Sequence, residues 1–204
     1  MTRTNPENGG RWGILGGTFD PVHRGHLNLA REIHNRKKLD GILLVPAFHP
    51  PHKPKVCEAS FEDRLTMLEK AVSGDDIFHI SLIETEMNRA GFTLNTVRAL
   101  KDKYPRTEFV FIVGSDNIEA IKDWYEPEAI FDEIEVISGA RPGYEPGDTN
   151  LFPANKIEFV PTDTVDIASS AIRDLIKKGA TSAELIKLMP EDVVAYITEK
   201  GLYR

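Results

Sequence analysis

Residues 13–27 read GILGGTFDPVHRGHL. An apolar run ends in two adjacent glycines, Gly16 and Gly17, and two histidines, His23 and His26, follow three residues apart. We interpret the stretch as a strand, a glycine turn and the start of a helix. Glycines at the end of a strand let another group approach the backbone closely, and the amino end of a helix attracts anions. The stretch therefore predicts an anion site suited to a phosphate.

The two histidines suggest how this site holds its anion. At a spacing of three, their imidazoles lie on nearly one side of a helical turn and can donate N–H groups to one phosphate. The pattern is neither a P-loop nor the GxGxxG fingerprint. Two alternatives stay open. Each histidine could be an ordinary packed residue, or the pair could bind a metal with His49 and His52, although zinc normally needs three or four clustered ligands.

Short β-branched or aromatic runs alternate with helical periodicity along the chain. We predict strands over 11–16, 41–46, 78–83, 108–114, 133–139 and 156–160. Helical stripes cover 27–34, 65–72 and 94–104, and three more helices occupy 169–178, 182–188 and the segment from Pro190 onward. This order predicts an α/β fold, a Rossmann-like parallel sheet with helices on both faces and a helical C-terminal part. The ligand crevice should lie at the carboxyl ends of the strands.

Composition and charge narrow the class of protein. For a chain of 204 residues we predict a flexible N-terminal lead-in over 1–10 and a single domain over 11–204. The first ten residues are polar and do not read as a signal peptide, and no apolar run approaches the ~18 residues of a membrane helix. We therefore expect a soluble, cytoplasmic protein. A net charge of −7 argues against nucleic acid or a membrane as partner. The single cysteine, Cys57, is given no role.

Together, these segments resemble a known family. TFDPVHRGHL carries the HxGH signature of the nucleotidyltransferase superfamily, and the longer GGTFDPVHxGHL form resembles the bacterial nicotinate mononucleotide adenylyltransferases. Further matching segments follow in order: VPAFHPPHK (45–53), DRLTML (63–68), GFTLNT (91–96), FIVGSDN (111–117), DWY (123–125), ARPG (140–143), IASSAIR (167–173) and MPEDVVAYITEKGLY (189–203). The similarity runs from about Trp12 to Tyr203, which is nearly the whole chain.

The resemblance implies a reaction of NAD biosynthesis. The phosphate of nicotinate mononucleotide attacks the α-phosphate of ATP, which gives nicotinate adenine dinucleotide and pyrophosphate. Because the nucleophile is already an anion, no general base is needed, and the enzyme must supply alignment and charge stabilisation. Mg²⁺ is expected to arrive bound to ATP. ATP and nicotinate mononucleotide are the expected partners, and assembly into a homo-oligomer is left open.

The resemblance also implies roles for single residues at the ATP end. Thr18, His23 and His26 would be catalytic, holding the α-phosphate, with His26 stabilising the developing charge. Ser169, Ser170 and Arg173 would bind the β- and γ-phosphates. The remaining ATP-binding residues would be Gly16, Gly17, Gly114 and Asp116.

At the pyridine end, the resemblance implies that Trp124 stacks on the ring. Thr93 and Tyr125 would offer backbone N–H groups to the carboxylate of nicotinate. Lys53 would contact a phosphate, and Arg141 would lie near the same substrate.

The sequence departs from the family pattern at two places. Ala168 stands in the segment that usually reads ISST, and Asn95 stands where YTxDT has its aspartate. The second change leaves open whether the acceptor is nicotinate mononucleotide or nicotinamide mononucleotide. We therefore keep three alternatives: another phosphorylated acceptor, a nucleotide-binding regulator without turnover, and a metal-dependent hydrolase using the four histidines.

Overall fold

The computed structural model describes residues 5–48, 57–87, 91–140, 156–163 and 167–204. Its centre is one parallel sheet of six strands in the order β3-β2-β1-β4-β5-β6. The strands are β1 (Gly10–Gly17), β2 (Gly41–Pro46), β3 (Phe78–Ile80), β4 (Thr107–Gly114), β5 (Glu135–Ala140) and β6 (Ile157–Pro161). The strand order reverses between β1 and β4, and a sheet of this kind binds ligands at that point. The Rossmann-like expectation is confirmed.

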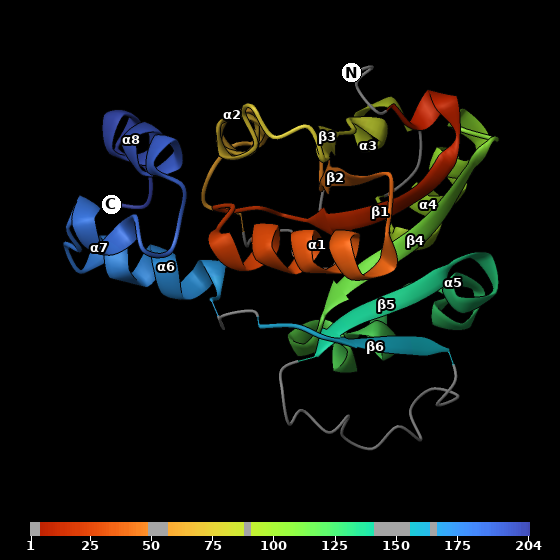
Figure 1. Ribbon diagram of the computed structural model, residues 1–204. Coiled ribbons are helices and arrows are strands. Elements are labelled where there is room, and N and C mark those ends of the chain that lie inside the picture. Colours follow the sequence, from red (N-terminus) through yellow and green to blue (C-terminus); the bar gives the residue numbers. More distant parts are fainter. Residues whose placement is uncertain (1–4, 49–56, 88–90, 141–155, 164–166) are drawn as a thin grey trace.

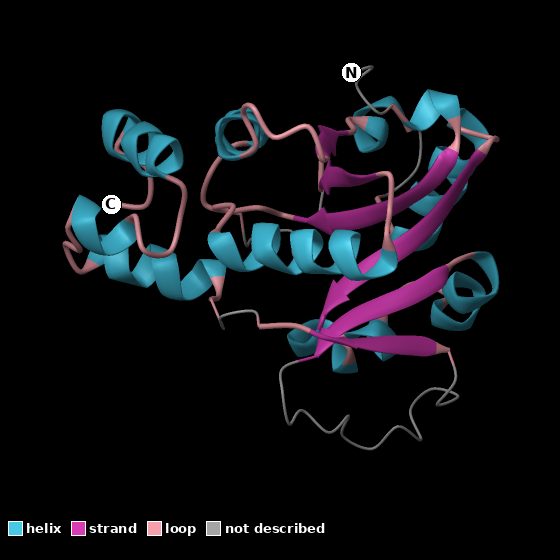
Figure 2. Ribbon diagram, in the orientation of Figure 1, coloured by secondary structure: helices cyan, strands magenta, loops and turns pink. Residues whose placement is uncertain are grey.

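Helices cover both faces of this sheet, as Figure 2 shows. The longer helices are α1 (Arg24–Lys37), α2 (Phe61–Ala71), α4 (Thr93–Lys103), α5 (Pro127–Glu133), α6 (Ser169–Lys177) and α8 (Glu191–Lys200). Two short ones are α3 (Ile83–Glu86) and α7 (Ser182–Leu185), and three 3₁₀ turns are η1 (Pro6–Asn8), η2 (Ser115–Asn117) and η3 (Glu119–Asp123). The helical C-terminal part predicted from the sequence therefore comprises α6, α7 and α8.

Alternation along the strands divides the core into two clusters. Leu15 of β1 and Ile112 of β4 belong to a cluster shared with α1, α2 and the C-terminal helices. Ile14 and Phe111, their neighbours in sequence, belong to a second cluster shared with α3, α4 and α5. A strand covered on both faces needs apolar residues at successive positions. This is why these strands read as continuous apolar runs.

The C-terminal helices pack beside the carboxyl end of β1 (Figure 1). The backbone N–H of Arg24, the first residue of α1, donates to the carbonyl of Leu188 at 2.8 Å. The hydroxyl of Ser169 donates to the carbonyl of Pro21 at 3.0 Å. These bonds join the last third of the chain to the turn between β1 and α1.

Several boundaries differ from the sequence predictions, and three of the differences concern how the chain folds locally. The predicted strand 78–83 ends at Ile80, because the chain turns there into α3. The predicted helix 182–188 is helical only over Ser182–Leu185. Within the predicted lead-in, residues 6–8 form η1, where Pro6 is buried and its carbonyl accepts from the Thr107 hydroxyl, and β1 begins at Gly10.

Within the described residues, none of the helices combines the length and hydropathy required to span a bilayer.

Candidate active site

A cavity of about 570 Å³ opens where the strand order reverses. Gly16 and Gly17 at the end of β1 and Gly114 at the end of β4 line it. Gly16 is exposed, and a Cβ there would lie no closer than 3.9 Å to the ring of Phe111. The glycine therefore leaves the space above the strand end open to a ligand. This is the position predicted from residues 13–27.

His23 and His26 line the same cavity and form a reciprocal cap on α1. His23 is the N-cap, in an extended conformation, and its Nδ1 accepts from the backbone N–H of His26 at 3.4 Å. The Nδ1 of His26 accepts from the backbone N–H of His23 at 3.3 Å. The two rings stack with centroids 3.6 Å apart. The predicted closeness of the rings is correct, but it comes from this cap and not from two positions within the helix.

The cap determines where the imidazole protons sit. A ring nitrogen that accepts a hydrogen bond carries no proton, so in both neutral rings the proton lies on Nε2. Burial lowers the pKa of His23 from 6.5 to about 4. Burial and then the neighbouring His23 ring lower the pKa of His26 well below 6.5. Both side chains are therefore neutral at pH 7, and each can offer one Nε2–H donor.

Three helices begin at this cavity. Besides His23 and His26 at the start of α1, the lining includes Phe92 and Thr93 at the start of α4. Ala168 and Ser169 line it at the start of α6. No described side chain caps α4 or α6 with a hydrogen bond. Three positive helix ends at one cavity suit a ligand with several negative charges.

The start of α6 brings further predicted residues to the wall. Ser169, Ser170 and Arg173 all line the cavity. The Arg173 guanidinium already donates to the carbonyl of Asp20 at 2.7 Å and to the carboxylate of Glu58 at 2.9 Å. Arg173 thus presents a positive charge at the cavity while its contacts hold neighbouring loops in place.

The opposite wall holds the residues predicted for the pyridine ring. Trp124 and Thr93 line the cavity, and Trp124 packs edge-on against Phe111 with centroids 5.9 Å apart. Tyr125 is exposed, and its ring stacks on Phe92 at 4.7 Å. Trp124 therefore belongs to both the core and the cavity wall, while Tyr125 lies beside that wall.

Several predicted residues cannot be placed. Lys53, Arg141, His49 and His52 lie outside the described residues, as does the side chain of Asp116, whose backbone is in η2. Across the described part of the chain, no three His, Cys, Asp or Glu side chains gather as a metal site would require.

Arg64 of α2 is a site residue that the sequence analysis did not assign. It is 2% exposed, and it donates to the carbonyls of Thr18 at 2.6 Å and Ala47 at 2.8 Å. Arg64 therefore joins the chain just after β1 to the chain just after β2. The sequence did contain a signal for this role. Arg64 lies on the same apolar helix stripe as Leu68 and Ala71, and a charged residue on a buried stripe needs hydrogen-bond or ion-pair partners.

Glu84 of α3 is a second residue that the sequence analysis missed. Its carboxylate lines the cavity and accepts from the backbone N–H of Phe48 at 3.0 Å and the hydroxyl of Thr96 at 2.9 Å. Burial raises the pKa of this carboxyl group, against the effect of these hydrogen bonds. Glu84 thereby connects the end of β2 to α4, and only the fold brings these segments together.

The chain is similar to known proteins along most of its length. A family model described as cytidylyltransferase-like matches residues 14–175. A Geobacter sulfurreducens protein named "Probable nicotinate-nucleotide adenylyltransferase" is 36% identical over 94% of this chain and 97% of its own length. A Geobacillus thermodenitrificans protein of the same name is 39% identical over 95% of this chain and 86% of its own length.

A solved structure has the same fold. It is "Plasmodium falciparum nicotinic acid mononucleotide adenylyltransferase complexed with NaAD", which superposes with a TM-score of 0.80 at 22% identity and covers 95% of this chain and 97% of its own.

Proposed function

The chain belongs to the cytidylyltransferase-like family, and from that premise we propose that it is a nicotinate-nucleotide adenylyltransferase of NAD biosynthesis. It transfers the adenylyl group of ATP to nicotinate mononucleotide and releases pyrophosphate. The observation that carries this function is the stacked, neutral pair His23 and His26 in a cavity where three helices begin. We also propose that residues 11–204 act as one domain, since the cavity combines residues from β1 through α6.

The reaction forms one bond and breaks one bond. An oxygen of the mononucleotide phosphate attacks the α-phosphorus of ATP, and the bond from that phosphorus to the oxygen bridging to the β-phosphorus breaks. The electron pair leaves with pyrophosphate. The attacking oxygen is already an anion, so the chain has to align the two phosphates and stabilise the charge that develops between them.

The neutral histidines suit this task. In our proposal the Nε2–H groups of His23 and His26 donate to oxygens of the α-phosphate, with Thr18 beside them. A neutral donor needs no proton transfer during the reaction, and the cap on α1 orients both rings beforehand. Gly16 and Gly17 leave room for the phosphate, and Ser169, Ser170 and Arg173 bind the leaving pyrophosphate.

Members of this family generally use a divalent metal with ATP. We propose that the ion is Mg²⁺ and that it enters as part of the Mg–ATP substrate, held mainly by phosphate oxygens and water.

The other substrate then meets the wall formed by α4 and Trp124. In our proposal Trp124 stacks on the pyridine ring, and the start of α4 faces the carboxylate of nicotinate. Phe92 and Thr93 at this helix start line the cavity, and the positive end of a helix favours an anionic group. Nicotinamide mononucleotide, which lacks this charge, should be the poorer acceptor.

A panel of acceptors tests the proposal. The chain, ATP and Mg²⁺ are incubated with nicotinate mononucleotide, nicotinamide mononucleotide or another phosphorylated compound, and pyrophosphate release is measured. We expect the highest kcat/KM with nicotinate mononucleotide. Product only with a non-pyridine phosphate would overturn the substrate assignment. ATP binding in calorimetry without any dinucleotide would indicate a regulator, and tightly bound stoichiometric zinc with activity lost on chelation would indicate a hydrolase.

A further inference from the structure

The carboxylate of Asp20 joins two distant parts of the chain to the turn after β1. Asp20 is 2% exposed, and its Oδ1 accepts from the hydroxyl of Tyr203 at 2.7 Å. The backbone N–H groups of Glu58 and Ala59 donate to the same carboxylate at 2.8 and 3.2 Å. Tyr203 follows α8, so the segment after this helix contacts the turn that precedes the histidines.

This turn contains a residue in an unfavourable conformation. Phe19 has φ = +50°, in the left-handed region that residues with bulky side chains rarely adopt. Such a conformation persists only where the surrounding structure holds it. Arg64 holds the carbonyl of Thr18 on one side of Phe19, and Tyr203 holds the carboxylate of Asp20 on the other. The two contacts fix the backbone on both sides of the strained residue.

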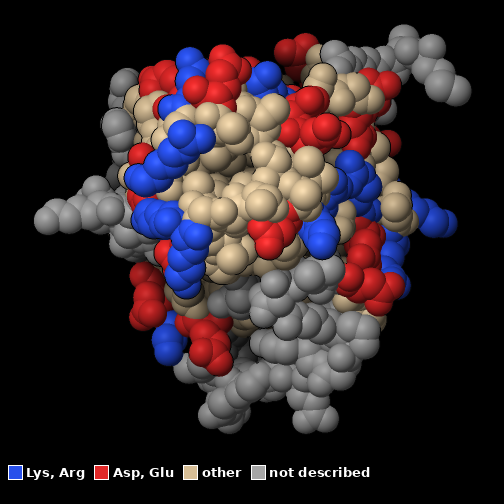
Figure 3. All heavy atoms as spheres, turned by 90° about the vertical axis from the view of Figure 1, so that its left-hand side faces the viewer, with Lys and Arg blue, Asp and Glu red and all other residues tan. Residues whose placement is uncertain are grey.

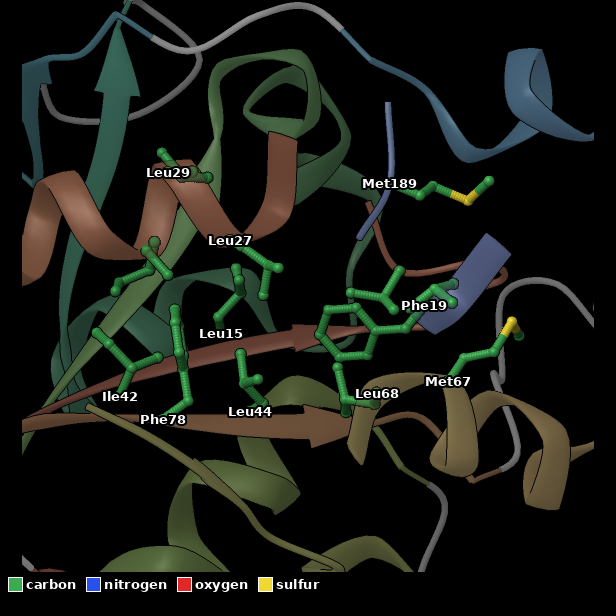
Figure 4. Close-up of a cluster of buried hydrophobic side chains, with 14 of the residues drawn as sticks. Leu15, Phe19, Leu27, Leu29, Ile42, Leu44, Met67, Leu68, Phe78 and Met189 are labelled. Carbon is green, nitrogen blue, oxygen red and sulfur yellow. The ribbon is translucent and has the colours of Figure 1, made fainter. Parts of the chain in front are cut away.

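The conformation of Phe19 directs its ring toward the histidine pair. The ring lies edge-on to the imidazole of His26, with centroids 5.1 Å apart. A Cβ on Gly17 would come within 3.3 Å of the same ring. Figure 4 shows Phe19 among buried side chains that include Leu68 and Met189. A displaced Phe19 would therefore change the room that both Gly17 and His26 have.

We propose that Tyr203 is a positioning residue for adenylyl transfer, because its hydrogen bond to Asp20 holds the turn that sets the Phe19 ring against His26. This inference rests on the proposed function. Tyr203 acts through Asp20 and Phe19, since its own side chain is buried away from the cavity lining. Burial, together with the bond to Asp20, raises the pKa of the Tyr203 hydroxyl, which therefore remains a donor throughout the physiological range.

The experiment compares Tyr203→Phe with a matched control, Tyr196→Phe. Tyr196 lies in α8, and its hydroxyl donates to the carboxylate of Asp63 at 2.8 Å, so the control removes the same kind of bond from the same part of the chain. The carboxylate of Asp20 keeps two N–H donors in Tyr203→Phe, so the variant should fold. We expect kcat per folded enzyme to fall about ten- to a hundredfold in Tyr203→Phe. The KM for ATP should change less than about twofold, and Tyr196→Phe should leave both constants within about twofold.

A purely structural role would give a different result. Tyr203→Phe would then lose thermal stability with kcat per folded enzyme unchanged, and the proposal would be overturned. NMR signals of the His26 imidazole provide a second measurement that does not depend on turnover. They should shift in Tyr203→Phe and stay in place in Tyr196→Phe. A wild-type chain without turnover would contradict the proposed function, and the NMR comparison would still decide this inference: unshifted His26 signals in both variants overturn it.

Discussion

His26 combines two tasks in one side chain. Its Nδ1 caps α1 by accepting from the backbone of His23, and this leaves Nε2–H as a donor at the cavity. Arg64 likewise uses its two terminal nitrogens to hold the carbonyls of Thr18 and Ala47. At the scale of single residues, the site is thus built from donors whose orientation the backbone determines.

Replacing His26 tests the donor role. We expect His26→Ala to lower kcat about 10²- to 10³-fold, the usual cost of losing one preorganised donor. ATP affinity should fall much less, because the hydrogen bond strengthens mainly as charge develops in the transition state. Steady-state kinetics and calorimetry measure the two effects.

Two further variants separate catalysis from folding. His26→Asn retains a side-chain acceptor for the His23 N–H and lacks Nε2–H, so its kcat should fall as far as that of the alanine variant. His34→Ala, in the last turn of the same helix, should leave kcat unchanged. Equal losses of kcat and ATP affinity in the His26 variants would contradict the assigned role.

At the scale of elements, the glycines of β1 have two different roles. Gly13 and its neighbours pack in the interior, where a Cβ on Gly13 would meet Ile112 and Ile42 at 2.7 Å. Gly16, three residues later, opens onto the cavity. The same strand therefore supports the core in its middle and forms the floor of the cavity at its carboxyl end.

Two glycine variants distinguish packing in the core from space in the cavity. Gly16→Ala should change the free energy of unfolding by about 1 kcal/mol or less, because the new methyl meets only the Phe111 ring at ordinary distance. It should weaken ATP binding by about 1–3 kcal/mol, as overpacking does. Gly41 of the neighbouring strand β2 provides the interior comparison, because in Gly41→Ala the methyl would collide with the Trp12 ring of β1. Stability should then fall while the ATP affinity of the folded protein is retained. Urea unfolding and calorimetry measure both; unchanged ATP affinity in Gly16→Ala would count against a phosphate at this strand end.

At the scale of the whole molecule, one sheet between two apolar clusters holds the cavity, and the C-terminal helices complete it. Figure 3 views the face on the side of these helices, where the coloured acidic and basic residues surround an area of other residues. The two signs of charge are interspersed on this face. Within the cavity, the positive groups at hand for a nucleotide are the starts of the helices and Arg173.

The burial of His23 makes the stability of the whole molecule depend on pH. The pKa of His23 is about 4 in the folded protein and 6.5 in the unfolded chain, so between these values the unfolded chain binds more protons. The free energy of unfolding therefore rises with pH in this window. The contribution of His23 is complete above pH 6.5 and is lost as the pH falls toward 4. A difference of this size corresponds to about 3 kcal/mol.

His23→Asn should flatten this dependence, because asparagine can still cap α1 and does not titrate. Urea unfolding between about pH 4 and 7 measures the slope for both proteins. His34→Asn serves as the control, and its slope should match that of the wild type. An unchanged slope in His23→Asn would show that the pKa of His23 is the same in the folded protein and in the unfolded chain, which would contradict this prediction.

Local patterns account for the parts of the fold that sequence analysis predicted. The apolar runs of β1 and β4 identify strands covered on both faces, and the glycine pair predicts the open strand end. Errors arose where tertiary packing overrode local preference. The segment 78–83 has strand-like composition. However, β3 is an edge strand that pairs with β2 over Phe78–Ile80, and the chain then turns into α3.

By itself, the sequence determined the order of the six strands and the glycine turn with its histidine pair at residues 16–26, because both depend on contacts between residues close in the chain. The tertiary structure alone decided the partners of Asp20 and Arg64 and the meeting of three helix ends at one cavity. Tyr203 lies 183 residues from Asp20. Neither periodicity nor a local motif encodes such a pairing, since it depends on how the C-terminal helices pack against the sheet.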